Sequence, residues 1–133
     1  MPKSVLIIDD QPQITVALMT RLQAAGYEVF HAINGLAGVE AAALHRPDAI
    51  ILDIRMPDID GYDACIRIKR LPGLAETPVI FLSANPQEVF RKRAMEVGGS
   101  TFLSKPYKAA DVIKVIEGLT SAANSREESV GNA

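Results

Sequence analysis

The chain of 133 residues has no tryptophan, only 5% aromatic residues and a single cysteine, Cys65. One cysteine cannot form an internal disulfide, and a lone thiol is typical of a reducing compartment, so we expect a cytoplasmic location. The low aromatic content disfavours surfaces that stack on single-stranded nucleic acid. Fourteen basic and sixteen acidic residues give a formal net charge of −2. This charge offers no general attraction to nucleic acid, and we expect no direct nucleic-acid binding.

Long hydrophobic runs are missing too, although 48% of the residues are hydrophobic. No stretch reaches the roughly 18 consecutive apolar residues of a membrane-spanning helix. The first residues, Met1 to Ser4, lead directly into a short apolar segment and lack the pattern of a secretory signal. The sequence therefore predicts a soluble protein with no membrane association.

Five short segments have the composition of β-strands. Most are near-continuous runs of valine, isoleucine and leucine, which is typical of strands covered on both faces. The predicted strands are residues 5–8, 27–32, 49–52, 79–82 and 101–103. The second segment mixes polar and apolar residues, which is typical of a strand at the edge of a sheet.

A segment of helical periodicity follows each predicted strand. Asn34 is expected to cap the second helix, and Gly26 and Gly98 are expected to end the first and the fourth. The third and fourth helices are expected at residues 61–70 and 86–97.

Alternation of strand and helix requires a parallel sheet, because each helix returns the chain to the same edge. We therefore predict an α/β fold with a doubly wound five-stranded parallel sheet, for which 2-1-3-4-5 is a common strand order. Residues 1–120 would form the single domain. Residues 121–133 are small, polar and charged, and we expect them to form a disordered C-terminal tail.

Acidic residues follow two of the predicted strands. Asp9 and Asp10 come after the first strand and Asp53 after the third, at the edge where parallel sheets bind ligands. If these strands are neighbours, the carboxylates converge, and their repulsion requires either a proton or a hard cation. Ligands that are all oxygen favour Mg2+. Because successive strand residues face opposite sides, Asp9 and Asp10 should not both be direct ligands.

Two further residues at this edge suit an anion. Ser83 ends the fourth strand and Lys105 follows the fifth, so they would supply a hydroxyl donor and a point charge to a phosphoryl-sized group. A carboxylate can itself accept a phosphoryl group, giving an aspartyl phosphate. The metal and Lys105 would then provide positioning and charge neutralisation.

The order and spacing of these residues resemble the receiver domain of two-component response regulators, the CheY-like proteins with a flavodoxin-like fold. The resemblance covers residues 4 to about 120 of the sequence. It rests on Asp9-Asp10, Asp53, Met56-Pro57, Gly61, Ser83-Ala84 and Lys105-Pro106.

The resemblance implies a role for each residue of the site. Asp53 would be the phosphoacceptor, and Ser83 and Lys105 would contact the phosphoryl oxygens. The Lys105–Pro106 peptide bond is expected to be cis. The implied Mg2+ ligands are Asp53, Asp10 directly, Asp9 largely through water, and the backbone carbonyl of Arg55.

The resemblance also implies a signalling switch rather than an enzyme, one that promotes only its own phosphorylation and dephosphorylation. Ser83 would move toward the phosphoryl group and Phe102 would swing inward, which changes the face formed by the last two predicted helices and the strand between them. That face would control a downstream protein or form a phosphorylation-dependent dimer. The donor would be a sensor histidine kinase or a histidine phosphotransfer protein. The surface of this chain that binds the donor would include Gln13, Ile14, Ala17 and Pro106.

Two positions distinguish this chain from many members of the family. Arg55, two residues after Asp53, places a long cation beside the phosphoryl site, and we expect it to alter the lifetime of the aspartyl phosphate. Phe102 stands where many relatives carry tyrosine, so a hydrogen bond from that hydroxyl to a partner is absent.

Structural roles compete with these functional ones. Asp9 or Asp10 could cap the following helix, Ser83 could cap the fourth helix, and Phe102 could simply belong to the core. For the whole chain we favour a single-domain regulator, with a receiver domain cut from a larger regulator or hybrid kinase as the alternative. A distant alternative is an aspartyl-nucleophile hydrolase resembling the haloacid dehalogenases, which carry a second acid where Arg55 stands.

Overall fold

The computed structural model describes residues 2–85 and 87–131, without the side chains of Ile14 and residues 122–131. Five strands alternate with five helices along the chain. The strands are β1 (Ser4–Ile8), β2 (Glu28–Ala32), β3 (Ala49–Asp53), β4 (Val79–Ser83) and β5 (Thr101–Ser104). The helices are α1 (Pro12–Ala24), α2 (Gly35–His45), α3 (Gly61–Lys69), α4 (Glu88–Glu96) and α5 (Ala109–Gly131).

All strands are parallel and lie in the order β2-β1-β3-β4-β5, so the predicted fold class and strand order are confirmed. The chain first winds toward β2 and then reverses toward β5. This reversal leaves β1 and β3 as neighbours at the centre of the sheet. The residues that follow these two strands are therefore brought together at the carboxyl edge.

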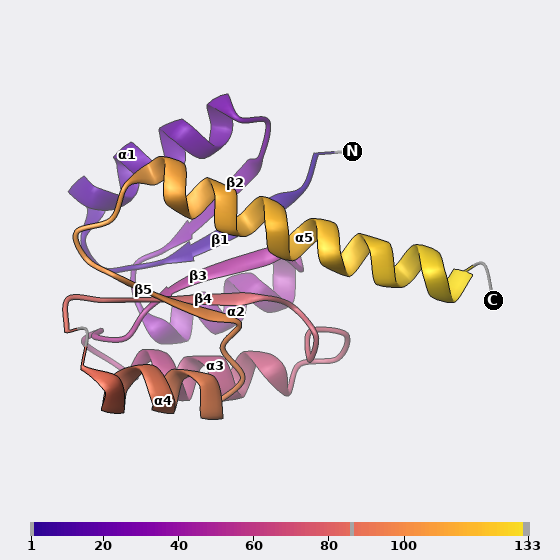
Figure 1. Ribbon diagram of the computed structural model, residues 1–133. Coiled ribbons are helices and arrows are strands. Elements are labelled where there is room, and N and C mark those ends of the chain that lie inside the picture. Colours follow the sequence, from indigo (N-terminus) through magenta and orange to yellow (C-terminus); the bar gives the residue numbers. More distant parts are fainter. Residues whose placement is uncertain (1, 86, 132–133) are drawn as a thin grey trace.

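Helices cover both faces of the sheet (Figure 1), with α1 and α5 on one face and α2, α3 and α4 on the other. The alternation of strand side chains divides the core accordingly. Leu6 and Ile8 of β1 belong to one buried cluster, whereas Val5 and Ile7 belong to the other. Each fully buried side chain of this size contributes about 1.5–3 kcal/mol, so the core holds the strand ends rigidly in place.

Local signals set the helix ends as the sequence predicts. Asn34 Oδ1 accepts a hydrogen bond from the backbone N–H of Ala37 at 2.8 Å, which caps α2. Gly26 follows α1 with a φ of 96°, and Gly98 follows α4 with a φ of 106°. Both angles lie in the region that glycine adopts without strain. α4 begins at Glu88, after its N-cap Gln87, whereas the sequence predicts a helix from residue 86.

The backbone of α5 continues as a helix through Gly131, whereas the sequence predicts a disordered tail from residue 121. In Figure 1 the C-terminal half of this helix projects beyond the sheet. Residues 121–131 include two alanines, two glutamates and one arginine, which favour helix even without a core to pack on. Residues 132–133 lie outside the described part of the chain, and the domain boundary at residue 120 stays a prediction. In the described residues, no helix has both the length and the hydropathy needed to span a membrane.

Candidate functional site

Three acidic side chains meet at the carboxyl edge of the sheet. Carboxylate oxygens of Asp9, Asp10 and Asp53 all lie within 4.8 Å of one another. Asp9 follows β1 directly and Asp53 ends β3, so the pairing of these two strands produces the cluster. Asp9 is 1% exposed and Asp53 is 6% exposed, whereas Asp10 is exposed. The predicted convergence is confirmed, and two of its three carboxylates are removed from water.

Lys105 supplies the positive charge opposite this cluster. Its Nζ donates to Asp53 Oδ2 at 2.9 Å and to Asp9 Oδ2 at 3.4 Å. The lysine comes directly after β5, and the peptide bond to Pro106 is cis, as predicted. The amine of Lys105 therefore points into the acidic cluster.

Burial and charge act against each other in this group. Burial raises the pKa of Asp53, the hydrogen bond and charge of Lys105 lower it, and the charge of Asp9 raises it, with a net increase. For Lys105, burial alone would lower the pKa, but the hydrogen bond and charge of Asp53 and the charge of Asp9 raise it overall. Three ionised carboxylates and one ammonium leave two net negative charges in a small volume. A divalent cation would balance them.

The donor set fits Mg2+. The cluster offers carboxylate oxygens only, with no sulfur or imidazole among the grouped ligands, and hard cations prefer such oxygens. Two of the three acids, Asp10 and Asp53, line an open cavity of about 480 Å3 that also leaves room for water ligands. It is lined by Asp10, Gln11, Asp53, Arg55, Ser83, Ala84, Asn85 and Lys105.

Ser83 lies in this cavity but its hydroxyl is bound to its own loop. Ser83 Oγ accepts from the backbone N–H of Asn85 at 3.0 Å and donates to the carbonyl of Asn85 at 3.2 Å. It does not cap α4, whose N-cap is Gln87, so the capping alternative for Ser83 is wrong. Ser83 is 7% exposed, and its hydroxyl can donate to an anion only by giving up the hydrogen bond that it donates to the carbonyl of Asn85.

The capping alternative for the acids is also not observed. The N-cap of α1 is Gln11, and no side chain caps this helix. Asp9 Oδ1 instead accepts from the backbone N–H of Gln11 at 2.9 Å, which fixes the carboxylate against the start of α1.

Gln11 is a site residue that the sequence analysis missed. Its Oε1 accepts a hydrogen bond from Lys105 Nζ at 3.3 Å. Its place between Asp10 and Pro12, on the loop that carries the acids, was the available signal.

Asp58, also missed, holds the loop after Asp53 against the neighbouring helix. Its two carboxylate oxygens accept from the backbone N–H groups of Gly35 and Leu36 at 2.9 and 2.8 Å, at the start of α2. A negative charge is favourable at a helix N-terminus. This contact restrains the segment that carries Arg55, which is exposed and lines the cavity.

Phe102 is part of the core, since it is 3% exposed and belongs to the cluster beneath α3 and α4. The guanidinium of Arg91 lies 5.4 Å from the centre of its ring, within the range of a cation–π contact. The core alternative for Phe102 is thus confirmed, and its switching role stays a prediction.

The predicted partner residues lie beside the acidic site. Ala17 and Pro106, with Leu18, Tyr107 and others, line an apolar hollow of about 280 Å3 between α1 and the loop after β5. Gln13 is exposed near the mouth of the acidic cavity. The side chain of Ile14 lies outside the described part of the structure.

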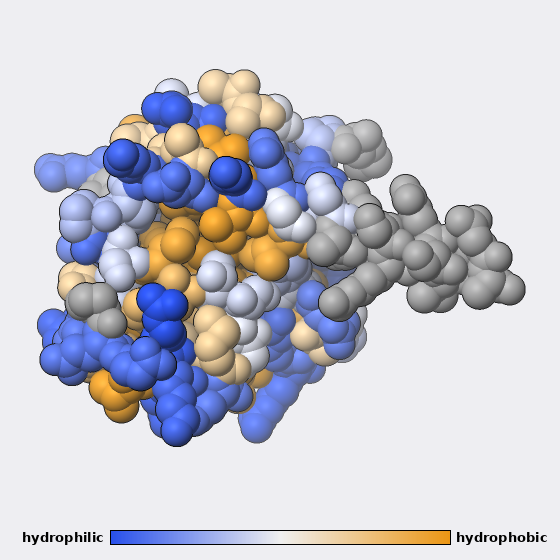
Figure 2. All heavy atoms as spheres, viewed as in Figure 1, coloured by the Kyte–Doolittle hydropathy of each residue, from blue (hydrophilic) through white to orange (hydrophobic). Residues whose placement is uncertain are grey.

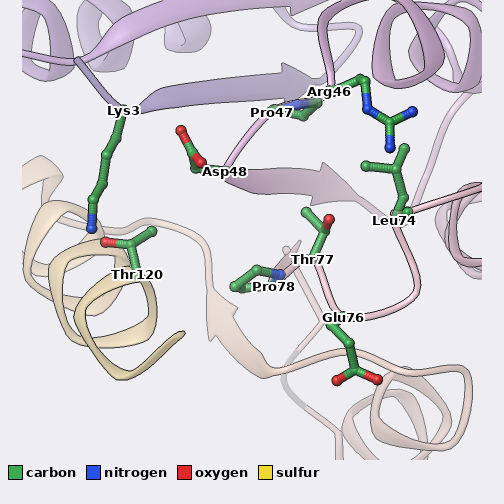
Figure 3. Close-up of a pocket in the computed structure, with 10 residues that line it drawn as sticks. Lys3, Arg46, Pro47, Asp48, Leu74, Glu76, Thr77, Pro78 and Thr120 are labelled. Carbon is green, nitrogen blue, oxygen red and sulfur yellow. The ribbon is translucent and has the colours of Figure 1, made fainter. Parts of the chain in front are cut away.

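Another cavity, also of about 280 Å3, lies away from the acidic site, at the opposite end of the sheet (Figure 3). Its lining includes Lys3, Arg46, Asp48 and Glu76, so it carries charges of both signs. Asp48 is already bound to the backbone N–H of Ser4 at 2.8 Å, and Arg46 to the carbonyl of Pro72 at 2.7 Å. Asp48 and Arg46 thus stabilise the loops at the amino edge of the sheet, and the charged groups do not point toward one common centre.

Comparison with protein families gives one match across nearly the whole domain. The profile of the response regulator receiver domain matches residues 5–117. Among curated proteins, the DNA-binding dual master transcriptional regulator RpaA of Synechocystis is 34% identical over 119 residues, which are 90% of this chain and 49% of that protein. The transcriptional regulatory protein PdtaR of Mycobacterium tuberculosis is 38% identical over 119 residues, covering 87% of this chain and 56% of that protein. The chain thus spans about half the length of these relatives.

Solved structures agree with this match. The receiver domain of a Francisella response regulator has a TM-score of 0.83 at 26% identity, covering 91% of this chain and 98% of that one. The receiver domain of a sensor histidine kinase from Pseudomonas aeruginosa also has a TM-score of 0.83, at 28% identity, and covers 91% of this chain and 99% of its own. That structure has a magnesium ion coordinated in its active-site cleft.

Proposed function

This chain belongs to the response regulator receiver domain family of two-component systems, and on that premise we propose that Asp53 is its phosphoacceptor. The donor is the phosphohistidine of a sensor histidine kinase or a histidine phosphotransfer protein. The observation that carries the proposal is the 2.9 Å contact of Lys105 Nζ with Asp53 Oδ2, inside a group of three acids that lie within 4.8 Å of one another. Receiver domains are signalling switches, so the proposed chemistry is limited to gain and loss of this phosphoryl group.

Mg2+ is the proposed cofactor. Asp10 and Asp53 would hold it, with Asp9 acting largely through water and the backbone carbonyl of Arg55 completing the protein ligands. When bound, the ion supplies positive charge to the oxygens of the transferring group. The group of acids fits it because its oxygens are close together and carry excess negative charge.

The side chains around Asp53 divide the remaining work. An Asp53 oxygen forms the new bond to phosphorus while the bond from phosphorus to the donor breaks. Lys105 stays bound near the new group and neutralises its oxygens. Ser83 reaches a phosphoryl oxygen by exchanging its bonds to Asn85. The movement of Ser83 and the packing of Phe102 then pass the change to the surface.

The proposed output surface is the face formed by α4, β5 and α5. Figure 2 shows an apolar strip over α5 and β5, bordered by hydrophilic side chains. An apolar strip with a polar border suits a protein partner. A downstream protein or a second phosphorylated copy would bind here. The resemblance to the family supports this proposal, because it implies a switch at the same face.

The proposed kinase surface is the hollow between α1 and the loop after β5. Ala17 and Pro106 line it, and Gln13 stands beside it, next to the cavity that holds Asp53. A donor histidine bound there could reach the acid.

We further propose that the protein is a single-domain regulator of the cytoplasm. The mass of the protein in its own cells and its location there would test both predictions.

Arg55 is the proposed determinant of phosphoryl lifetime. It is exposed and lines the cavity, so its guanidinium can contact the phosphoryl group or shield it from water. Arg55→Ala would then change the decay rate of the aspartyl phosphate. An equal rate in the two proteins would eliminate this role.

Acetyl phosphate with Mg2+ tests the phosphoacceptor directly. The intact mass should increase by one phosphoryl group in the wild type and stay unchanged in Asp53→Asn. Asp63→Asn is the matched control, because Asp63 lies on the surface of α3, ten residues further along the chain, where it pairs with Arg67. Phosphorylation of Asp53→Asn to the wild-type level would refute the proposal.

A further inference from the structure

Gln11 occupies a helix N-cap but does not use its side chain as a cap. At this position a side-chain oxygen usually accepts a hydrogen bond from the first turn of the helix. The Gln11 Oε1 instead accepts from Lys105 Nζ, 94 residues away in the sequence, at 3.3 Å. Its backbone N–H donates to Asp9 Oδ1 at 2.9 Å. The residue therefore contacts both a buried acid and the cation of the site.

The ammonium of Lys105 has three hydrogens and three acceptors around it. The bond to Asp53 Oδ2 is the shortest at 2.9 Å, and those to Gln11 Oε1 and Asp9 Oδ2 are 3.3 and 3.4 Å. Asp9 is 1% exposed, whereas Gln11 is exposed and lines the cavity. Asp9 therefore draws the ammonium toward the interior, and Gln11 draws it toward the mouth of the cavity. Of the three acceptors, Gln11 alone is uncharged.

We propose that Gln11 is a positioning residue for phosphoryl transfer, holding Lys105 Nζ on the side of Asp53 from which the phosphoryl group arrives. The inference rests on the proposed function. With acetyl phosphate as donor, an Asp53 oxygen bonds to phosphorus, and acetate leaves with the electron pair of the broken bond. The charge that develops lies on oxygens beyond Asp53, toward solvent. An ammonium held outward meets this charge without first leaving the two carboxylates.

Gln11→Met and Gln23→Met form the matched pair of variants. Methionine is close to glutamine in length but offers no comparable acceptor. α1 loses no cap in Gln11→Met, because the glutamine side chain makes no capping bond. Gln23 is exposed in the last turn of α1, at the end of the helix away from the acids. We expect phosphorylation by acetyl phosphate to slow roughly threefold to tenfold in Gln11→Met, the range of one lost hydrogen bond, and to stay unchanged in Gln23→Met.

A second readout uses the unphosphorylated protein without metal. The side-chain ammonium of Lys105, followed by 15N NMR, should exchange its protons with water faster in Gln11→Met than in the wild type and Gln23→Met. A Lys105 signal that is unchanged in Gln11→Met would overturn the inference, whether or not the rate changes. Equal phosphorylation rates in all three proteins would also overturn it and would leave the proposed function intact. A wild type that acetyl phosphate fails to phosphorylate would instead remove the proposed function, and the inference with it.

Discussion

At the scale of single residues, the ammonium of Lys105 stabilises acidic side chains that lie close together in one small volume. Asp9 and Asp53 are both nearly inaccessible to water, and a buried carboxylate without a partner is costly. One ammonium contacts both, but it leaves the group negative. The remaining negative charge attracts a divalent cation or an incoming electrophile. The site is therefore suited to bind such a group, because its own charges do not balance.

The buried thiol of Cys65 gives a residue-scale prediction. The side chain is 0% exposed, and burial raises its pKa from 9.0 to about 11, while the charge of Lys69 opposes the change. A shift of this size leaves about 100-fold less thiolate near pH 8 than an ordinary cysteine has, and thiolate is the reactive form. Iodoacetamide should therefore label the native protein at least about 100-fold more slowly than the urea-unfolded protein. Labelling at similar rates would show that this part of the core is open.

Some residues of the site could be predicted from the sequence, whereas the hydrogen bonds of others could not. Asp9, Asp53 and Lys105 were predictable because each lies at the carboxyl end of a strand that the sequence predicts, and the ends of parallel strands meet at one edge. The bonds of Ser83 and Gln11 were not predictable. Both side chains can bind their own loop, cap a helix or reach across the site, and only the packed loops decide which partner is nearest.

At the scale of elements, the start of α3 packs closely against the backbone at the end of β3, at Asp53. A Cβ atom at Gly61, the first residue of α3, would overlap the backbone carbonyl oxygen of Asp53. Backbone atoms cannot move aside as a flexible side chain can. The close approach of α3 to the end of β3 therefore requires glycine, and this approach helps to fix the carbonyl and carboxylate of Asp53.

Two Gly→Ala variants separate this packing from helix propensity. Gly61→Ala should lower the free energy of unfolding by about 1–3 kcal/mol, the usual cost of overpacking. Gly118→Ala, in α5, has no atom within 4 Å of the added Cβ and should raise it by about 0.5–1 kcal/mol. Urea unfolding followed by circular dichroism measures both. A Gly61→Ala protein as stable as the wild type would contradict the close packing at Asp53.

The contact of Asp58 with the start of α2 gives a pH-dependent prediction. Desolvation opposes the charged form, but the backbone N–H groups of Leu36 and Gly35 outweigh it and lower the pKa of Asp58 below its ordinary 3.8. An acid with a lowered pKa in the folded state stabilises the fold above 3.8, and this contribution is lost as the pH falls through the lowered value. Asp58→Asn should therefore be less stable than the wild type at pH 7. The difference should shrink as the pH is lowered past 3.8.

Urea unfolding at a series of pH values tests this contact. Asp63→Asn is a suitable control, since Asp63 pairs with Arg67 on the exposed surface of α3 at 3.3 Å, and such pairs contribute little. A stability difference for Asp58→Asn that stays constant with pH would show that its charge does not act on α2.

At the scale of the whole molecule, the strand order was predictable and the extent of the last helix was not. Apolar runs separated by helical patterns restrict the chain to few topologies, because crossovers between parallel strands have one hand. The polar segment after residue 120 carries no such restriction. The same composition suits a solvated helix and a disordered tail, and the structure extends α5 to Gly131.

The strand order also explains why the residues of the candidate site lie together at the carboxyl edge of the sheet. The reversal of strand order puts β1 and β3 side by side, and their loops open on the same cavity. β5, which underlies part of the apolar strip (Figure 2), leads directly into Lys105, and Lys105 lines this cavity. Under the proposed function, a phosphoryl group at Asp53 would affect a partner surface through Lys105 and Phe102.

The most direct measurement locates the phosphoryl group. The protein is treated with acetyl phosphate and Mg2+ and then reduced with borohydride, which converts an aspartyl phosphate into homoserine, and its peptides are sequenced by mass spectrometry. We expect homoserine at position 53 and unchanged aspartate at Asp9, Asp10 and Asp58, with the signal lost when EDTA removes the metal. Homoserine at Asp9 or Asp10, or none in a protein that has gained a phosphoryl group, would contradict the assignment of Asp53 as the phosphoacceptor.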